Sequence, residues 1–135
     1  MFAAAPLMIL PVIAYNLFAQ VLGGGFASRD ANARLTAPIF RLPTASGGDW
    51  PVSGADLLLA ASLVVLFIEL IKSTGSRRVA LVNHALSMLL FIGCLVEMLL
   101  APAFATSTFF LITLMVLMDV LAGFIVAVGR RDGGA

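Results

Sequence analysis

The sequence predicts an all-α integral membrane protein, a bundle of four transmembrane helices. The chain is 61% hydrophobic and only 11% charged, its mean hydropathy is +1.11, and its apolar residues gather in four long stretches. Soluble domains contain about 25% charged residues, and a water-soluble fold of 135 residues cannot enclose so much apolar surface. Lipid can contact such a surface directly. We therefore treat residues 1–135 as a single transmembrane domain.

The first apolar stretch, over about residues 5–22, is the most interrupted of the four. Two prolines lie in its first part, where a missing N–H group is better tolerated. Asn16 and Gln20 are four residues apart and share one helix face. The stretch stops at a run of three glycines that begins at Gly23. The amino terminus lacks the positive charge of a secretory signal, so we expect this helix to be retained.

Three later stretches are more continuous and predict helices over about 55–71, 79–101 and 107–128. Ser53 and Asp56 have the spacing of a capping box before the first of these. Thr106 or Ser107 is a suitable N-cap for the last, and Gly129 a suitable stop. The joins between the three are short and polar or proline-containing. Tight turns of this kind make the second, third and fourth helices antiparallel neighbours.

A long loop, residues 23–54, follows the first helix. It contains several charged residues and glycines and ends close to Trp50. Long loops in compact proteins are functional or disordered. We favour a connector without regular structure whose Ile39, Phe40 and Trp50 rest on the membrane surface, because tryptophan is enriched there.

Basic residues predict the orientation in the membrane. With four spans, both termini share a side with the turn between the second and third helices. That side has five basic residues and the loop side has three: Lys72, Arg77, Arg78, Arg130 and Arg131 against Arg29, Arg34 and Arg41. The excess predicts a multi-pass protein of the inner, cytoplasmic membrane with its N- and C-termini in the cytoplasm.

Polar residues inside the apolar stretches are the candidate functional residues, because an ionisable group at mid-bilayer costs about 2.5–3.5 kcal/mol. Asp119 lies near the middle of the fourth helix. Steps of three and four residues align it with Thr108, Ile112 and Met115, the pattern of a packed helix face. Gly123 lies beside it and allows another backbone to approach.

The third helix has a polar stripe with the same spacing. The stripe consists of Asn83, Ser87, Leu90, Cys94 and Glu97. His84 is one residue off this stripe and is expected to donate to Asp119 or to Glu69. Gln20 and Glu97 are expected to lie at a similar depth. The candidates for a proton relay are therefore Asp119, Glu97, His84 and Glu69, and the candidates for interhelical packing and hydrogen bonding are Asn16, Gln20, Asn83, Ser87, Cys94 and Gly123.

Local explanations compete with these roles. Glu69 precedes Lys72 by three residues, so we favour an ion pair between them at the water boundary. For Asp119 and Glu97, an interhelical structural hydrogen bond and a role in transport both remain open.

The residues that common enzyme chemistries need are missing from the sequence. One cysteine excludes an internal disulfide and a CxxC motif, and one histidine excludes a His-pair metal site within one chain. We find no credible Ser-His-Asp or Cys-His arrangement and no P-loop. We therefore expect neither an enzyme nor a cofactor or metal. The net charge of +1 and the scattered arginines argue against nucleic acid as a partner.

Three functions remain compatible with the sequence. The favoured one is a small non-catalytic membrane protein, an accessory or assembly subunit of a larger inner-membrane complex. Its expected partners are the lipid bilayer and other integral membrane proteins or further copies of the chain. The alternative is an oligomeric proton- or ion-coupled transporter or channel that uses Glu97 and Asp119, with His84 in the relay. The least favoured is a haem-binding electron-transfer subunit, because one histidine cannot supply both axial ligands.

Overall fold

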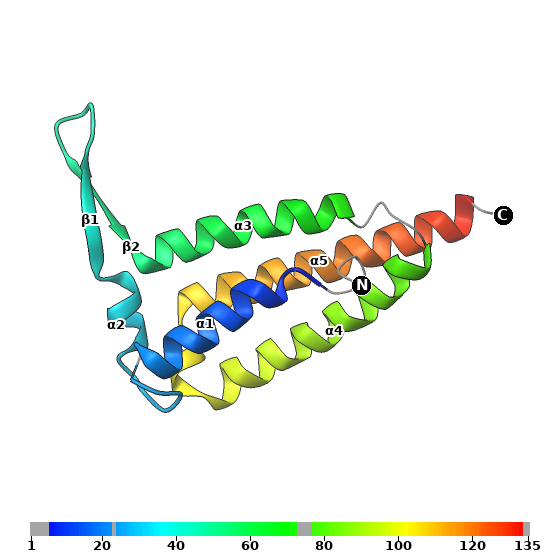
Figure 1. Cartoon of the computed structure of the whole chain (residues 1–135), viewed down its shortest axis with the longest axis horizontal. Coiled ribbons are helices and arrows are strands. Elements are labelled where there is room, and N and C mark those ends of the chain that lie inside the picture. The colour runs from blue at the N-terminus through cyan, green and yellow to red at the C-terminus, as the bar shows by residue number, and fades with distance from the viewer. Residues whose placement is uncertain (1–5, 23, 73–76, 134–135) are drawn as a thin grey trace.

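The computed structural model of the chain describes residues 6–22, 24–72 and 77–133. Four long helices lie alongside one another, with α1 and α4 running in one direction and α3 and α5 in the other (Figure 1). The elements are α1 (Ile9–Val21), α2 (Ala31–Thr36), β1 (Pro38–Pro43), β2 (Asp49–Ser53), α3 (Gly54–Lys72), α4 (Arg77–Leu100), the 3₁₀ helix η2 (Pro102–Phe104) and α5 (Ser107–Gly133).

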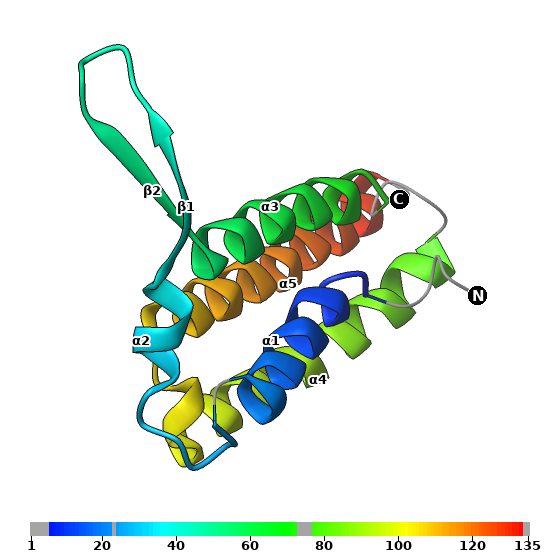
Figure 2. The ribbon, with the colours of Figure 1, turned by 60° about the vertical axis from the view of Figure 1, so that its left-hand side comes forward.

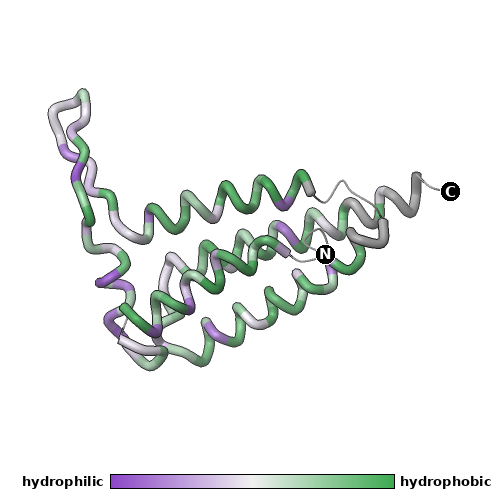
Figure 3. The backbone as a smooth tube through the Cα atoms, in the orientation of Figure 1, coloured by the Kyte–Doolittle hydropathy of each residue, from purple (hydrophilic) through white to green (hydrophobic). Residues whose placement is uncertain are grey.

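Three of these helices are long and apolar enough to cross a membrane. The candidate spans are Gly54–Ile71, Leu81–Leu100 and Ser107–Ile125. The helix α1 is apolar but has only 13 residues, because it begins at Ile9 rather than near residue 5. Hydrophobic residues cover most of the length of all four helices (Figure 3). The prediction of a mostly helical protein is therefore confirmed, and three of its helices have the length and composition that a membrane span requires.

The helix α5 is the centre of the bundle, since it packs against α1, α3 and α4. Its inward face is the one that the sequence predicts: Thr108, Ile112 and Asp119 are all buried. Large apolar side chains on the outer faces of the helices, among them Leu89 and Phe67, remain exposed. This distribution suits a bundle that contacts lipid on its outside.

Tyr15 ties α1 to the beginning of α5. Its hydroxyl lies 2.7 Å from the carbonyl oxygen of Ala103 and 2.7 Å from Oγ1 of Thr106. Because a carbonyl only accepts, Tyr15 donates to Ala103, and the Thr106 hydroxyl donates to Tyr15. Thr106 Oγ1 also accepts a 3.1 Å hydrogen bond from the backbone N–H of Phe109, which confirms Thr106 as the N-cap. The Tyr15 ring packs against those of Phe104 and Phe109, with centroids 5.2 and 4.7 Å apart.

The start of α3 agrees with the sequence prediction, and the end of α5 differs from it. The capping box before α3 is confirmed: Ser53 N–H donates to Asp56 Oδ2 at 3.0 Å, and Asp56 N–H donates to Ser53 Oγ at 3.3 Å. The predicted stop at Gly129 is wrong, because α5 continues to Gly133. Gly129 does not have the positive φ of a helix-ending glycine, whereas Gly24 and Gly25 after α1 do.

The long loop is structured, contrary to our expectation of an irregular connector. It forms α2 and then an antiparallel hairpin in which Leu42 pairs with Trp50 and Phe40 with Val52. Gly47 supplies the positive φ, +88°, that the turn between the strands requires. The hairpin extends across the direction of the helices rather than along it (Figure 2). The strands β1 and β2 are too short to be identified by periodicity alone, and glycines and charged residues lie around them.

Two predictions concern residues whose backbone or side chains the structure does not describe. The polar turn over 72–78 is described only at its edges. The orientation argument depends on Lys72, Arg77, Arg78, Arg130 and Arg131, whose side chains are not described.

The Tyr15 contacts predict the effect of Tyr15→Phe. This change keeps the ring but leaves a buried carbonyl and the Thr106 hydroxyl without their partner, which costs roughly 1–3 kcal/mol. We expect a lower unfolding temperature for the purified protein in detergent, measured by circular dichroism. The control is Thr36→Val, which removes an exposed hydroxyl that bonds within its own helix to Asn32. Equal unfolding temperatures for Tyr15→Phe and Thr36→Val would contradict this account.

Candidate functional site

Glu69 is buried at the end of the bundle where α3 ends and α4 begins. Its side chain has 0% exposure. Oε1 accepts a 2.8 Å hydrogen bond from Nδ2 of Asn83, and Oε2 accepts one of 2.9 Å from the backbone N–H of Leu7. This carboxylate therefore joins α3, α4 and the segment before α1. Glu69 is thus buried, and the predicted ion pair with Lys72 stays a prediction, because the Lys72 side chain lies outside the described residues.

Asp119 is the second buried carboxylate, with 3% exposure. Its Oδ2 accepts a 2.9 Å hydrogen bond from the hydroxyl of Ser87. The bond joins the middle of α5 to α4. This is the interhelical hydrogen bond that the sequence left open as one explanation for the residue.

Both acids are thus held by neighbouring positions of one stripe on α4. Asn83 and Ser87 are four residues apart, so their side chains lie on the same helix face. Asn83, Ser87 and Cys94 are buried, whereas most other α4 side chains are exposed. Of the predicted polar stripe, these three residues are therefore buried, and Leu90 and Glu97 are partly buried. Through this stripe, one helix supplies hydrogen-bond donors to acids on two others.

His84 occupies a different position from the one expected. Asn83 donates to Glu69 and Ser87 to Asp119, where we expected His84 to donate to one of these acids. The imidazole packs instead against Gly123 of α5, where a Cβ atom would lie only 2.9 Å from Nδ1. Gly123 therefore makes room for a side chain, rather than for the backbone approach that the sequence suggested.

Two buried polar atoms at this end of the bundle have no hydrogen-bond partner within the described ranges. They are Oδ1 of Asn83 and Nδ1 of His84. Unpaired buried polar groups are uncommon and costly in folded proteins. These two atoms lie on the same helix as the residues that bond Glu69 and Asp119.

Glu97 lies near the opposite end of α4 and is only partly buried. Asn16 Nδ2 approaches its Oε1 at 3.5 Å and also donates to the carbonyl oxygen of Val12 at 2.8 Å. Gln20, which we expected at the depth of Glu97, is exposed on α1. Glu97 therefore lies at the depth of Asn16, which is one helical turn from Gln20. An error of one turn is expected when depth is estimated from rise per residue. Cys94 is a free, buried thiol between the two ends.

Sequence reasoning did not select Tyr15 or the N–H of Leu7. A signal for Tyr15 was present, because it is the one tyrosine of the chain and lies within an apolar helix. A buried tyrosine hydroxyl needs a partner. The Leu7 contact has no side-chain signature and only the folded chain reveals it.

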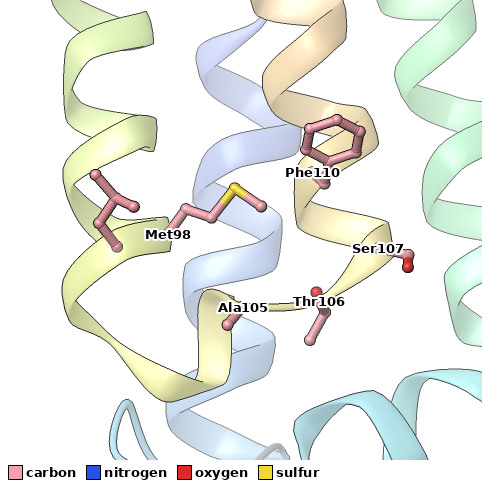
Figure 4. Close-up of a pocket in the computed structure, with 6 residues that line it drawn as sticks. Met98, Ala105, Thr106, Ser107 and Phe110 are labelled. Atoms are coloured by element: carbon pink, nitrogen blue, oxygen red, sulfur yellow. The ribbon is translucent and has the colours of Figure 1, made fainter.

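A shallow hollow of about 390 Å³ lies where α4, η2 and α5 meet (Figure 4). Met98 and Phe110 approach it from the two helices, and Ala105, Thr106 and Ser107 come from the turn. The Thr106 hydroxyl is already bonded to Tyr15. The hollow is therefore lined mainly by apolar groups and offers a ligand few polar contacts.

The described residues include no group of three or more His, Cys, Asp or Glu side chains arranged to hold a metal ion. The buried carboxylates accept bonds from neutral amide, hydroxyl and backbone groups. Such an arrangement can lock helices together or exchange a proton.

A scan against protein-family models, a search of curated proteins and a search of solved structures each gave no significant match.

The contact between His84 and Gly123 predicts opposite effects for two glycine substitutions. Gly123→Ala places a methyl group against the imidazole, and we expect a loss of roughly 1–3 kcal/mol of unfolding free energy from overpacking. Gly93→Ala is the matched control on α4, because nothing lies within 4 Å of its Cβ position. Alanine there should stabilise the helix by about 0.5–1 kcal/mol.

Chemical unfolding in mixed micelles measures both changes. In a His84→Ala background, adding Gly123→Ala should no longer destabilise. If Gly123→Ala is as stable as Gly93→Ala in the wild-type background, the packing argument fails.

Proposed function

We propose that this protein is a small non-catalytic accessory subunit of a larger inner-membrane complex, and that the β1–β2 hairpin is its docking arm. The observation that supports this most is an exposed apolar hairpin face. Phe40 and Leu42 are each 42% exposed and Trp50 is 54% exposed. Large exposed apolar surfaces outside a lipid-facing region are typical of interaction sites.

The hairpin has two chemically different faces. Alternate residues of a strand point to opposite sides, so the observed register places Phe40 and Leu42 together with Trp50 and Val52. The other face has charged and proline residues, namely Arg41, Pro43, Asp49 and Pro51. Val52 is buried at the base of the hairpin, at 4% exposure. The apolar face thus begins in the core and continues outward along the arm.

Side chains, rather than added strands, are the expected means of contact. Pro38 and Pro43 in β1 and Pro51 in β2 lack the N–H group that strand addition uses. Proline at sheet edges protects against pairing with another chain. A two-stranded hairpin is also marginally stable alone in water. A partner surface that covers Phe40, Leu42 and Trp50 would stabilise it.

The direction of the arm fits a partner in the same membrane. The hairpin leaves the bundle across the helix direction and extends sideways beyond α3 (Figures 1 and 2). If the helices are upright in the bilayer, the arm runs along the membrane surface. It is then placed to lie over the outer rim of a neighbouring membrane protein.

The proposal includes α1 as a fourth membrane span. The N–H of Leu7 bonds Glu69 near the end of α3, and Leu22 and Gly54 line one groove at its beginning. The segment from Leu7 to Leu22 therefore accompanies α3 over about 22 Å at about 1.5 Å per residue. This length is short of the ~30 Å core and requires local thinning or flanking residues at the interface. Four spans and the excess of basic residues favour cytoplasmic termini and an arm on the opposite side.

The second candidate function is an oligomeric proton- or ion-coupled transporter or channel. The burial of Glu69 and Asp119 favours it, because intramembrane acids commonly take part in proton relays. This function needs a wet path between the acids and both surfaces. Flux through vesicles that contain the purified chain alone would support it over the accessory-subunit proposal.

The test of the docking arm is gentle purification of the tagged protein from its native membrane. We expect larger membrane proteins to be recovered in fixed stoichiometry with the wild type. Recovery should fall severalfold for the double variant Phe40→Ser, Trp50→Ala, because these exposed anchors are central to the apolar face. The matched control is Phe67→Ser with Leu63→Ala, which changes exposed apolar residues of α3 within its lipid-facing length.

Two outcomes contradict the proposal. One is recovery of a homogeneous self-assembly without larger proteins. The other is unchanged recovery of the partner by the hairpin variant, as expected if the hairpin only rests on lipid.

A further inference from the structure

Two adjoining apolar grooves along α1 and α3 share the lining residues Ala14 and Leu58, and we call them together the crevice; the first groove is also lined by residues of α2 and β1. The first, of about 290 Å³, extends from Arg34 and Gly54 to Ala14 and Leu58. The second, of about 210 Å³, continues from the same Ala14 and Leu58 to Leu10, Ala61 and Val65. The small side chains of Ala14 and Ala61 leave the space open. The crevice therefore runs along the bundle between two helices.

The cation of Arg34 lies at one end of this crevice. Its Nη1 donates a 2.8 Å hydrogen bond to the carbonyl oxygen of Leu22, and its side chain is exposed. Arg34 makes no ion pair within the described ranges, although Asp30, the N-cap residue of α2, lies four residues earlier in the chain. A guanidinium has five N–H donors in a planar fork that matches the oxygens of a phosphate. Arg34 thus has donors available for an anion.

Arg34 lies at the end of the crevice near Leu22 and the start of α3. It lines the same groove as Gly54, the first residue of a candidate span. From Leu22 to Leu10 the crevice follows α1 for about 18 Å at about 1.5 Å per residue. One leaflet of the hydrocarbon core is about 15 Å deep, half of the ~30 Å bilayer core. The crevice therefore has the length of one acyl chain, with a cation at the headgroup end.

We propose that this crevice binds a phospholipid from the leaflet on the hairpin side. One acyl chain lies between α1 and α3, and the headgroup phosphate pairs with Arg34. The apolar lining, the length and the single cation at the mouth together define this occupant. The inference rests on the proposed position of α1 within the membrane, but it does not require a protein partner on the hairpin face.

The test titrates the detergent-purified full chain with phosphatidylglycerol and counts bound lipid by native mass spectrometry. We expect one tightly bound lipid per wild-type chain. Arg34→Gln should weaken binding by about tenfold or more, because it removes a charge-assisted contact. Ala61→Phe should weaken binding similarly by filling the crevice. Diacylglycerol, which lacks the phosphate, should bind at least tenfold more weakly to the wild type.

Two control variants keep the comparison matched. Arg41→Gln removes an exposed arginine of β1, and Ala60→Phe adds a ring beside Ala61 at a residue that does not line the crevice. Both should bind phosphatidylglycerol like the wild type. Unsaturable binding of many lipids, or binding by Arg34→Gln or Ala61→Phe within twofold of the wild type, overturns the proposal. Ala61→Phe keeps Arg34 and its hydrogen bond to Leu22, which Arg34→Gln removes. It therefore tests the site without changing that hydrogen bond.

Discussion

The rest of the structure depends on the need of two buried carboxylates for hydrogen-bond donors. Glu69 and Asp119 lie inside an apolar bundle, where an unsatisfied acid costs several kcal/mol. Asn83 and Ser87 on one face of α4 meet part of this need, and the first described residues of the chain contribute a backbone N–H. These bonds fix the register of α4 against α3 and α5. An apolar interface between membrane helices lacks such directional constraints, since lipid is as apolar as leucine.

The bundle is built differently at its two ends. At the Glu69 end, polar bonds join the helices and His84 packs on Gly123. At the other end, aromatic rings pack around Tyr15. The Tyr15 and Thr106 hydroxyls bond each other, and Tyr15 also donates to the carbonyl oxygen of Ala103. This second end also bears α2 and the hairpin. The rigid aromatic cluster therefore supports the part of the protein that we propose meets a partner, while the polar end sets helix register.

Much of this architecture can be predicted from the sequence, because the helices give strong local and periodic patterns. Length and hydropathy located the three long helices, and spacing of three and four identified the buried faces of α4 and α5. The capping box of Ser53 and Asp56 was also predictable. The pairing of individual polar side chains was not predictable. Asn83 is one residue from His84 and Ser87 is three residues from it, and shifts this small are within the error of a depth estimated from rise per residue. The hairpin was missed because its strands are short and interrupted by proline.

The central claim is that the bonds between α4 and the buried acids hold the helices together. A double-mutant cycle on Ser87→Ala and Asp119→Leu, measured by the free energy of unfolding in bicelles, tests it most directly. The cycle isolates this pair from the other contacts of Asp119. Hydrogen bonds between membrane helices contribute about 0.6 kcal/mol on average and up to about 1.7 kcal/mol. The account predicts a favourable coupling energy within that range, toward its upper end because both groups are buried. A coupling energy of zero would contradict it.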